Sequence, residues 1–183
     1  MGQLILILGG ARSGKSAYAE RLAHERGGAV LFVATATAGD DEMAQRIAAH
    51  RADRPAAWRT LEAPTGVAAA VAGVDSAADI ILLDCVTLLI SNLLLAHEAV
   101  GEAATGEAID AEIAALLARI DTAAATWIVV SNEVGMGLVP PYPLGRAYRD
   151  LLGRVNARLA ARADRAYLLV AGLPLDLKRL MAE

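Results

Sequence analysis

Residues 4–16 read Leu-Ile-Leu-Ile-Leu-Gly-Gly-Ala-Arg-Ser-Gly-Lys-Ser. The five apolar residues that open this stretch are typical of a strand buried on both faces, as in a parallel sheet. Gly9, Gly14, Lys15 and Ser16 then match the pattern G-x-x-x-x-G-K-[ST] in full. An apolar strand precedes the pattern and a helical segment follows it, which is the context that the pattern requires. The stretch therefore predicts a P-loop NTPase domain.

Phosphate binding explains why glycines occur in this loop. They permit the backbone angles that turn consecutive N–H groups toward one concave site, and the following helix adds the positive end of its dipole. We expect Lys15 to act catalytically at the β- and γ-phosphates and Ser16 to bind Mg²⁺ through its hydroxyl. A chance glycine turn is the alternative. The predicted nucleotide-binding residues here are the whole loop: Gly9, Gly10, Ala11, Arg12, Ser13, Gly14, Lys15 and Ser16.

Beyond the loop, segments with strand patterns alternate with segments of helical periodicity. Further strands are predicted at 29–34, 79–83, 126–130 and 166–170, and helices at 16–26, from 40 or 41 to 51, at 67–74, 87–96, around 109–120 and at 146–163. The stretches 98–106 and 135–145 are predicted to be loops because glycine, proline and polar residues punctuate them. This alternation indicates an α/β fold with a mostly parallel sheet. No boundary interrupts it, so residues 1–183 are expected to form one domain.

Composition narrows the function classes. Hydrophobic residues make up 56% of the chain and aromatic residues 4%, so an aliphatic core is expected and disorder is excluded. The net charge of −4 gives no basic footprint, and we expect no nucleic-acid partner. Residues 80–96 are apolar but contain Asp84 and are shorter than the about 20 residues of a membrane span. Cys85 is the single cysteine, which fits a cytoplasmic protein and suggests an unreactive small hydrophobe.

Two polar sites follow predicted strands at the edge where the phosphate loop lies. Asp84 comes directly after four apolar residues, and ligands gather at the carboxyl ends of strands in such sheets. We expect Asp84 to complete the Mg²⁺ shell, with a helix N-cap as the alternative. Ser131, Asn132 and Glu133 end the fourth strand and suggest γ-phosphate or acceptor contacts, although ordinary strand ends are also polar.

Two further groups of charged residues stand out. The stretch 40–62 is rich in arginine and acids, and Met43, Ile47 and His50 fall on one helix face. By pattern alone, His50 fits a structural histidine as well as a site residue. A row at i, i+4 and i+8 in the last long helix fits a solvated face or a phosphate contact: Arg154, Arg158 and Arg162.

Together these motifs resemble one family. The loop at 9–16 is similar to the opening of the bifunctional adenosylcobinamide kinase/adenosylcobinamide-phosphate guanylyltransferases. The block at 41–62, with Asp-Glu-Met at 41–43 and His-Arg at 50–51, agrees with it. The run Ser-Asn-Glu-Val-Gly-Met-Gly-Leu-Val-Pro at 131–140 is the most specific, and Gly-Arg-Val-Asn at 153–156 completes the set. The resemblance covers about residues 4–178.

The resemblance implies a cobalamin-assembly enzyme with two activities. It would phosphorylate adenosylcobinamide with ATP or GTP, and then transfer GMP from GTP to adenosylcobinamide phosphate, releasing pyrophosphate. It also implies a RecA-like sheet, a homotrimer and a histidine that carries the guanylyl group, which is His50 at the matching position. The guanosine contacts implied in this way are Ala34, Thr35, Ala36, Arg51, Ala52, Asp53, Arg54 and Glu62.

Two departures and two alternatives accompany the resemblance. Asp84 stands where some relatives place glutamate, and Ala49 stands where some carry a second histidine. Either acid suits a Mg²⁺ shell, and the alanine leaves His50 as the single nucleophile candidate in its segment. The alternatives are another small-molecule P-loop kinase without guanylyl transfer, and a non-enzymatic nucleotide-binding module.

Overall fold

The computed structural model describes residues 2–38, 44–45, 48, 51–52, 54–97, 99 and 101–180. Seven strands form one sheet in the order β3-β2-β4-β5-β1-β6-β7. Six of them run parallel, and only β7 is antiparallel to its neighbour β6. The strands are β1 (Leu4–Gly9), β2 (Val30–Ala34), β3 (Arg59–Glu62), β4 (Ile80–Asp84), β5 (Thr126–Val130), β6 (Arg165–Val170) and β7 (Leu173–Asp176).

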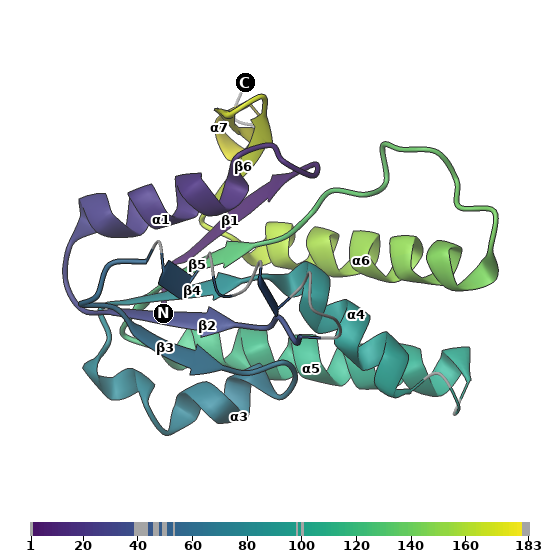
Figure 1. Ribbon diagram of the computed structural model, residues 1–183, viewed down its shortest axis with the longest axis horizontal. Coiled ribbons are helices and arrows are strands. Elements are labelled where there is room, and N and C mark those ends of the chain that lie inside the picture. The colour runs from purple at the N-terminus through teal and green to yellow at the C-terminus, as the bar shows by residue number, and fades with distance from the viewer. Residues whose placement is uncertain are drawn as a thin grey trace.

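Helices cover both faces of this sheet (Figure 1). They are α1 (Lys15–Arg26), α3 (Val67–Ala72), α4 (Val86–Ala96), α5 (Glu102–Thr122), α6 (Pro143–Arg162) and the short α7 (Leu177–Leu180), with a 3₁₀ turn η1 at Asp75–Ala77. In the stretch 44–52 the described residues are helical as well. Within the part of the chain that the structure describes, no helix combines the length and apolarity that crossing a membrane requires.

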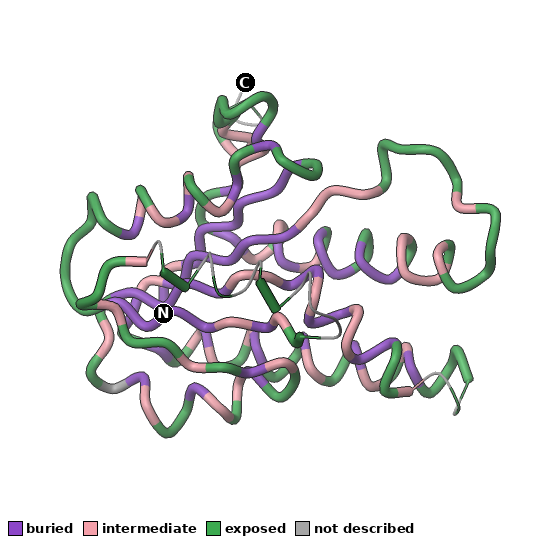
Figure 2. Tube along the Cα trace, in the orientation of Figure 1, coloured by how far each residue is buried: buried purple, intermediate pink, exposed green. Residues whose placement is uncertain are grey.

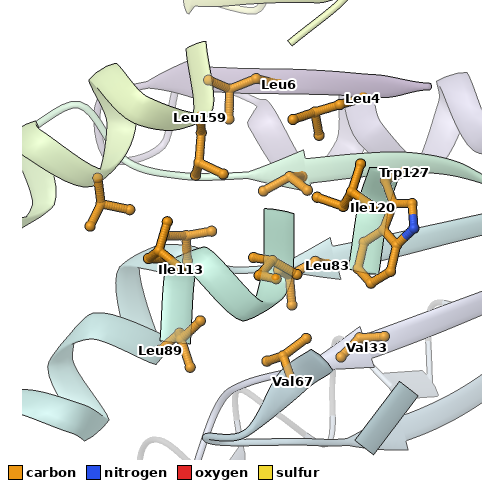
Figure 3. Close-up of a cluster of buried hydrophobic side chains, with 14 of the residues drawn as sticks. Leu4, Leu6, Val33, Val67, Leu83, Leu89, Ile113, Ile120, Trp127 and Leu159 are labelled. Carbon is orange, nitrogen blue, oxygen red and sulfur yellow. The ribbon is translucent and has the colours of Figure 1, made fainter. Parts of the chain in front are cut away.

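The core lies in two layers because successive side chains of a strand point to opposite faces. Ile5 and Ile7 of β1 belong to the smaller layer, which α1 closes with Ala19 and Ala23. On the other face, alternate residues of the same strands meet side chains of α3, α4, α5 and α6, and Trp127 is fully buried among them (Figure 3). The α/β fold expected from the sequence is therefore confirmed, with an aliphatic core.

The two edge strands escaped the sequence analysis. β3 has charged ends and only Leu61 half-buried, so it carries no apolar run. β7 contains Pro174 and is mostly exposed, and it returns from β6 through a tight turn in which Ala171 has a φ of 51°. Edge strands tolerate proline and polar residues because half of their backbone groups face solvent or a single neighbour. Such strands do not show the buried pattern on which the prediction relied.

Two predicted loops were too long. α5 begins at Glu102, inside the stretch 98–106, and continues through Gly106. α6 begins at Pro143, because proline is favoured in the first helical turn where its missing N–H costs nothing.

The strand register places the carboxyl ends of the parallel strands in one row: Ala34 pairs with both Glu62 and Asp84, and Asp84 pairs with Val130. The candidate site lies along this row.

Candidate functional site

The loop after β1 has the geometry of a phosphate cradle. Gly9 has a φ of 154°, and Gly14 adopts a left-handed conformation with a φ of 90° as the N-cap of α1. A Cβ atom on Gly9 would lie 2.6 Å from the carbonyl oxygen of Leu169 and 2.6 Å from Oγ of Ser13. Any side chain at Gly9 would therefore displace the loop. The turn is closed by the N–H of Ser13, which donates to the carbonyl of Gly10 at 3.3 Å.

Lys15 lies over this loop as the first residue of α1. Its side chain is 8% exposed, and Nζ donates to the carbonyl of Gly10 at 2.6 Å. Burial lowers the pKa of Lys15 below its usual value, and the negative charge of Asp84 opposes that shift. Asp84 is thus close enough to act electrostatically on the lysine. The carboxylate at the end of β4 therefore lies within electrostatic range of the loop after β1.

The segment after β5 contacts the same loop. The N–H of Glu133 donates to the carbonyl of Gly9 at 3.0 Å. The preceding residue is held by two neighbouring helices: the N–H of Asn132 donates to Oγ1 of Thr87 at 2.7 Å, and Nδ2 of Asn156 donates to the carbonyl of Asn132 at 2.9 Å. Asn132 and Glu133 therefore stand beside the phosphate loop on a fixed backbone.

A second set of hydrogen bonds joins the ends of β2 and β4. Oγ1 of Thr35 donates to the carbonyl of Cys85 at 2.7 Å and accepts from its N–H at 2.9 Å. Thr35 is fully buried and also donates its own N–H to the carbonyl of Asp84 at 3.3 Å. Burial raises the pKa of Cys85 to about 11, so its thiol is protonated at neutral pH. A protonated thiol agrees with the unreactive role expected of this cysteine.

A pocket of about 360 Å³ opens at the β2–β3 end of the row. It brings together several residues that the resemblance assigns to guanosine. Across it, Nη1 of Arg51 lies 3.4 Å from Oε1 of Glu62. The guanidinium of Arg54 stacks 3.5 Å from the ring centroid of Phe32. The pocket is lined by Ala34, Ala36, Thr37, Ala38, Arg51, Arg54, Thr60, Glu62 and Pro64.

Electrostatics connects this pocket to the phosphate loop. Burial lowers the pKa of Arg54, whereas the charges of Glu20 on α1 and of Asp84 raise it. The carboxylate of Asp84 therefore acts on both Lys15 and Arg54. If a nucleotide bound with its nucleoside in the pocket and its phosphates on the loop, it would lie near this carboxylate.

The sequence analysis did not identify Asn92, which holds the pocket wall at Pro64, or Glu112, which binds the N-terminus of α3. Nδ2 of Asn92 donates to the carbonyl of Thr35 at 2.8 Å and to that of Pro64 at 3.0 Å, which joins two walls of the pocket. The carboxylate of Glu112 accepts from the N–H groups of Gly66 and Val67 at 3.0 and 2.8 Å. A polar Asn92 within the apolar stretch 80–96 was the one available signal.

The arginine row of α6 and part of the segment 40–62 remain to be located. Arg158 and Arg162 form ion pairs with Asp110 and Asp121 of α5, at 2.5 and 2.7 Å, and so join two helices. Arg154 is exposed. The predicted nucleophile His50 and the predicted contact Asp53 lie outside the described residues, as do residues 40–43 and 47 of the same segment.

A divalent cation would need ligands from the nucleotide as well as from the protein. Among the described residues, no group of three or more His, Cys, Asp or Glu side chains is placed to hold a metal ion. Ser16, in the first turn of α1, and Asp84 offer a hydroxyl and a carboxylate. Oxygen donors of this kind are the ones Mg²⁺ takes in phosphoryl-transfer sites, where phosphate and water oxygens complete the shell. The residues present therefore fit this ion.

Comparison with known proteins shows the family of this chain. Residues 5–177 match the family described as cobinamide kinase / cobinamide phosphate guanyltransferase. The bifunctional adenosylcobalamin biosynthesis protein CobP of Pseudomonas aeruginosa is 49% identical over 94% of this chain and 96% of its own length. The corresponding CobU proteins of Salmonella typhimurium and Escherichia coli are 44% and 41% identical, each over 96% of this chain and 99% of their own length.

Proposed function

This chain belongs to the cobinamide kinase / cobinamide phosphate guanyltransferase family, and from that premise we propose that it transfers the guanylyl group through a covalent bond to His50. The two activities themselves follow from the family. The enzyme phosphorylates adenosylcobinamide with a nucleoside triphosphate and then joins GMP from GTP to the new phosphate, releasing pyrophosphate. Both are steps of cobalamin biosynthesis.

The phosphate loop carries the proposal for the kinase step. Lys15 lies over the loop with its ammonium group on the carbonyl of Gly10, and Asp84 acts on it from the end of β4. We assign Lys15 to the β- and γ-phosphates, and Ser16 and Asp84 to Mg²⁺. The ion would neutralise charge that develops on the transferred phosphoryl group. The hydroxyl of adenosylcobinamide attacks the γ-phosphorus, its proton is lost, and the nucleoside diphosphate leaves.

The β2–β3 pocket carries the proposal for guanosine. Its walls hold an arginine stacked on Phe32 and the Arg51–Glu62 pair, which offer donors and an acceptor to a purine. A carboxylate accepts two hydrogen bonds from the N1–H and the 2-amino group of guanine, and adenine has neither of these donors. We assign Glu62 to this recognition. Arg51 and Arg54 would bind the phosphates that accompany the nucleoside.

The histidine step divides one difficult transfer into two. An imidazole nitrogen attacks the α-phosphorus of GTP, the bond to pyrophosphate breaks, and a P–N bond forms. An oxygen of adenosylcobinamide phosphate then attacks the same phosphorus and frees the imidazole. His50 directly precedes Arg51, which lines the pocket, and this adjacency supports its assignment. Attack requires the neutral imidazole, because a protonated ring nitrogen has no free electron pair to form the bond.

Labelling with radioactive GTP tests the covalent step. The protein should gain label from α-labelled GTP and none from γ-labelled GTP, and the bond should break in acid and survive alkali, as P–N bonds to imidazole do. His50→Ala should lose the label and keep kinase activity. His24→Ala, at an exposed histidine of α1, is the matched control and should label normally. Label that persists in His50→Ala would assign the nucleophile to another residue.

We also propose that the chain acts as a cytoplasmic homotrimer. The family resemblance supports the trimer, and the single cysteine supports a reducing compartment. Light scattering of the purified protein should give three times the 19.0 kDa of one chain. A mass of 19.0 kDa at working concentration would contradict the trimer.

A further inference from the structure

One surface segment is unusually apolar. Residues 134–145, called here the apolar arm, contain no charged side chain and read Val-Gly-Met-Gly-Leu-Val-Pro-Pro-Tyr-Pro-Leu-Gly. Met136 is 78% exposed, Leu138 97%, Val139 61% and Tyr142 60%. Single exposed apolar residues are ordinary, but a contiguous group of them marks a binding surface. Figures 1 and 2 show this stretch leaving the end of β5 as an exposed arch before the chain returns in α6.

The apolar arm starts at the phosphate loop. Glu133, the residue before it, donates its N–H to the carbonyl of Gly9 at 3.0 Å. The carboxylate of Glu133 also accepts from the N–H of Gly135 at 2.6 Å. The first residues of the arm are thus tied to the site where the γ-phosphate is transferred. A molecule that rests on the arm has one end close to that phosphate.

The far end of the arm is anchored as well. Nη1 of Arg146 donates to the carbonyls of Pro140 and Pro141, at 3.1 and 2.8 Å. A Cβ on Gly145 would lie 2.5 Å from the ring of Tyr142 and 2.8 Å from Pro140, so the arm packs closely against itself here. Three prolines further restrict its backbone. The exposed side chains therefore project from a backbone of restricted conformation, which lowers the entropy cost of binding.

The other parts of the two substrates already have places. The proposed function assigns the phosphates to the loop at 9–16 and the nucleoside to the β2–β3 pocket. The arm follows β5, and β4 separates β5 from β2 in the sheet, so the arm does not start at the strands that line that pocket. What remains is the acceptor. Its reacting hydroxyl must reach the γ-phosphate, and its bulk is a corrin ring, a large apolar macrocycle with uncharged amide side chains.

We propose that the apolar arm is the docking surface for the corrin ring of the acceptor. The arm would bury its exposed methionine, leucine, valine and tyrosine side chains against the ring without desolvating any charge of its own. The inference rests on the family's kinase activity, which supplies the acceptor. The proposal goes beyond that activity because it names the segment of this chain that holds the acceptor. It also explains why this stretch is uncharged in an acidic enzyme with a charged surface.

Two serine substitutions on the arm test the proposal. Met136→Ser/Leu138→Ser removes two side chains that have no part in the core, so the fold should survive. Leu95→Ser is the matched control, because Leu95 is an apolar residue of α4 with 58% exposure. Equilibrium dialysis against adenosylcobinamide, followed by its visible absorption, gives the acceptor affinity. Titration with a non-hydrolysable GTP analogue gives the nucleotide affinity, and light scattering gives the mass.

The double variant should bind adenosylcobinamide at least about tenfold more weakly, as loss of apolar anchors does. Its nucleotide affinity and mass should match those of the wild type, and Leu95→Ser should change none of them. Unchanged acceptor affinity in the double variant would overturn the docking surface alone. If the double variant has a lower mass than the wild type, the arm is an interface between copies of the chain. If the wild type binds phosphatidylcholine vesicles and the double variant does not, the arm is a membrane contact. A wild-type chain that binds no adenosylcobinamide would overturn both the arm and the family activity.

Discussion

Replacement of Asn156 by leucine should damage both stability and kinase activity. Asn156 is 4% exposed, and its Oδ1 accepts from Oγ of Ser131 at 2.7 Å while its Nδ2 donates to the carbonyl of Asn132. Leucine fills a similar volume but leaves that hydroxyl and that carbonyl unpaired. At about 1–3 kcal/mol for each unpaired buried group, the free energy of unfolding should fall by about 2–6 kcal/mol.

The function should suffer for a geometric reason. The carbonyl that Asn156 holds belongs to the residue before Glu133, whose N–H is bonded to Gly9 of the phosphate loop. Loosening this backbone should lower kcat of the kinase step, measured at a temperature where the variant is folded. Arg154→Ala is the matched control: it changes an exposed residue on the same helix and should alter stability by less than about 0.5 kcal/mol.

Urea unfolding of a double-mutant cycle provides the decisive measurement. Ser131→Ala alone leaves Oδ1 of Asn156 unpaired and should cost about 1–3 kcal/mol. In the Asn156→Leu background the same change should cost almost nothing, because the serine has already lost its partner. Costs that add to within about 0.5 kcal/mol would refute the reasoning, since independent sites add in this way.

Four further results are expected. Ser16→Ala and Asp84→Asn should each raise the Mg²⁺ concentration for half-maximal kinase activity; unchanged dependence would place the ion elsewhere. Glu62→Gln should raise KM for GTP in guanylyl transfer with the urea midpoint unchanged, because the Arg51–Glu62 pair is exposed and such pairs contribute about 0–1 kcal/mol. Cys85, with its pKa raised from 9.0 to about 11, should react with iodoacetamide at pH 8 about a hundredfold more slowly in the native than in the urea-unfolded protein. The same shift should lower stability as pH rises from about 9 to about 11, because the folded state then retains the proton and the unfolded state does not.

Local patterns were sufficient for the central part of this molecule. A strand buried on both faces must be apolar, so β1, β2, β4 and β5 are visible as apolar runs in the sequence. The phosphate loop follows from glycine spacing, because only particular backbone angles turn several N–H groups toward one anion. The placement of Asp84 beside it follows from the rule that carboxyl ends of parallel strands share an edge. Each of these inferences needs only neighbours in the chain.

Contacts between distant segments were decided by the tertiary structure alone. β3 and β7 bury too little to show an apolar run, yet pairing of β3 with β2 is what places Glu62 next to Ala34 at the pocket. Asn92 and Asn156 lie on helices that pack against the sheet, and their hydrogen-bond partners lie 57, 28, 25 and 24 positions away along the chain. The sequence alone was enough to predict a phosphate-binding loop, because that prediction depends on local glycine spacing. The packing of helices on the sheet determined which side chains hold the site in shape, because a buried polar group is satisfied by whatever the fold brings to it.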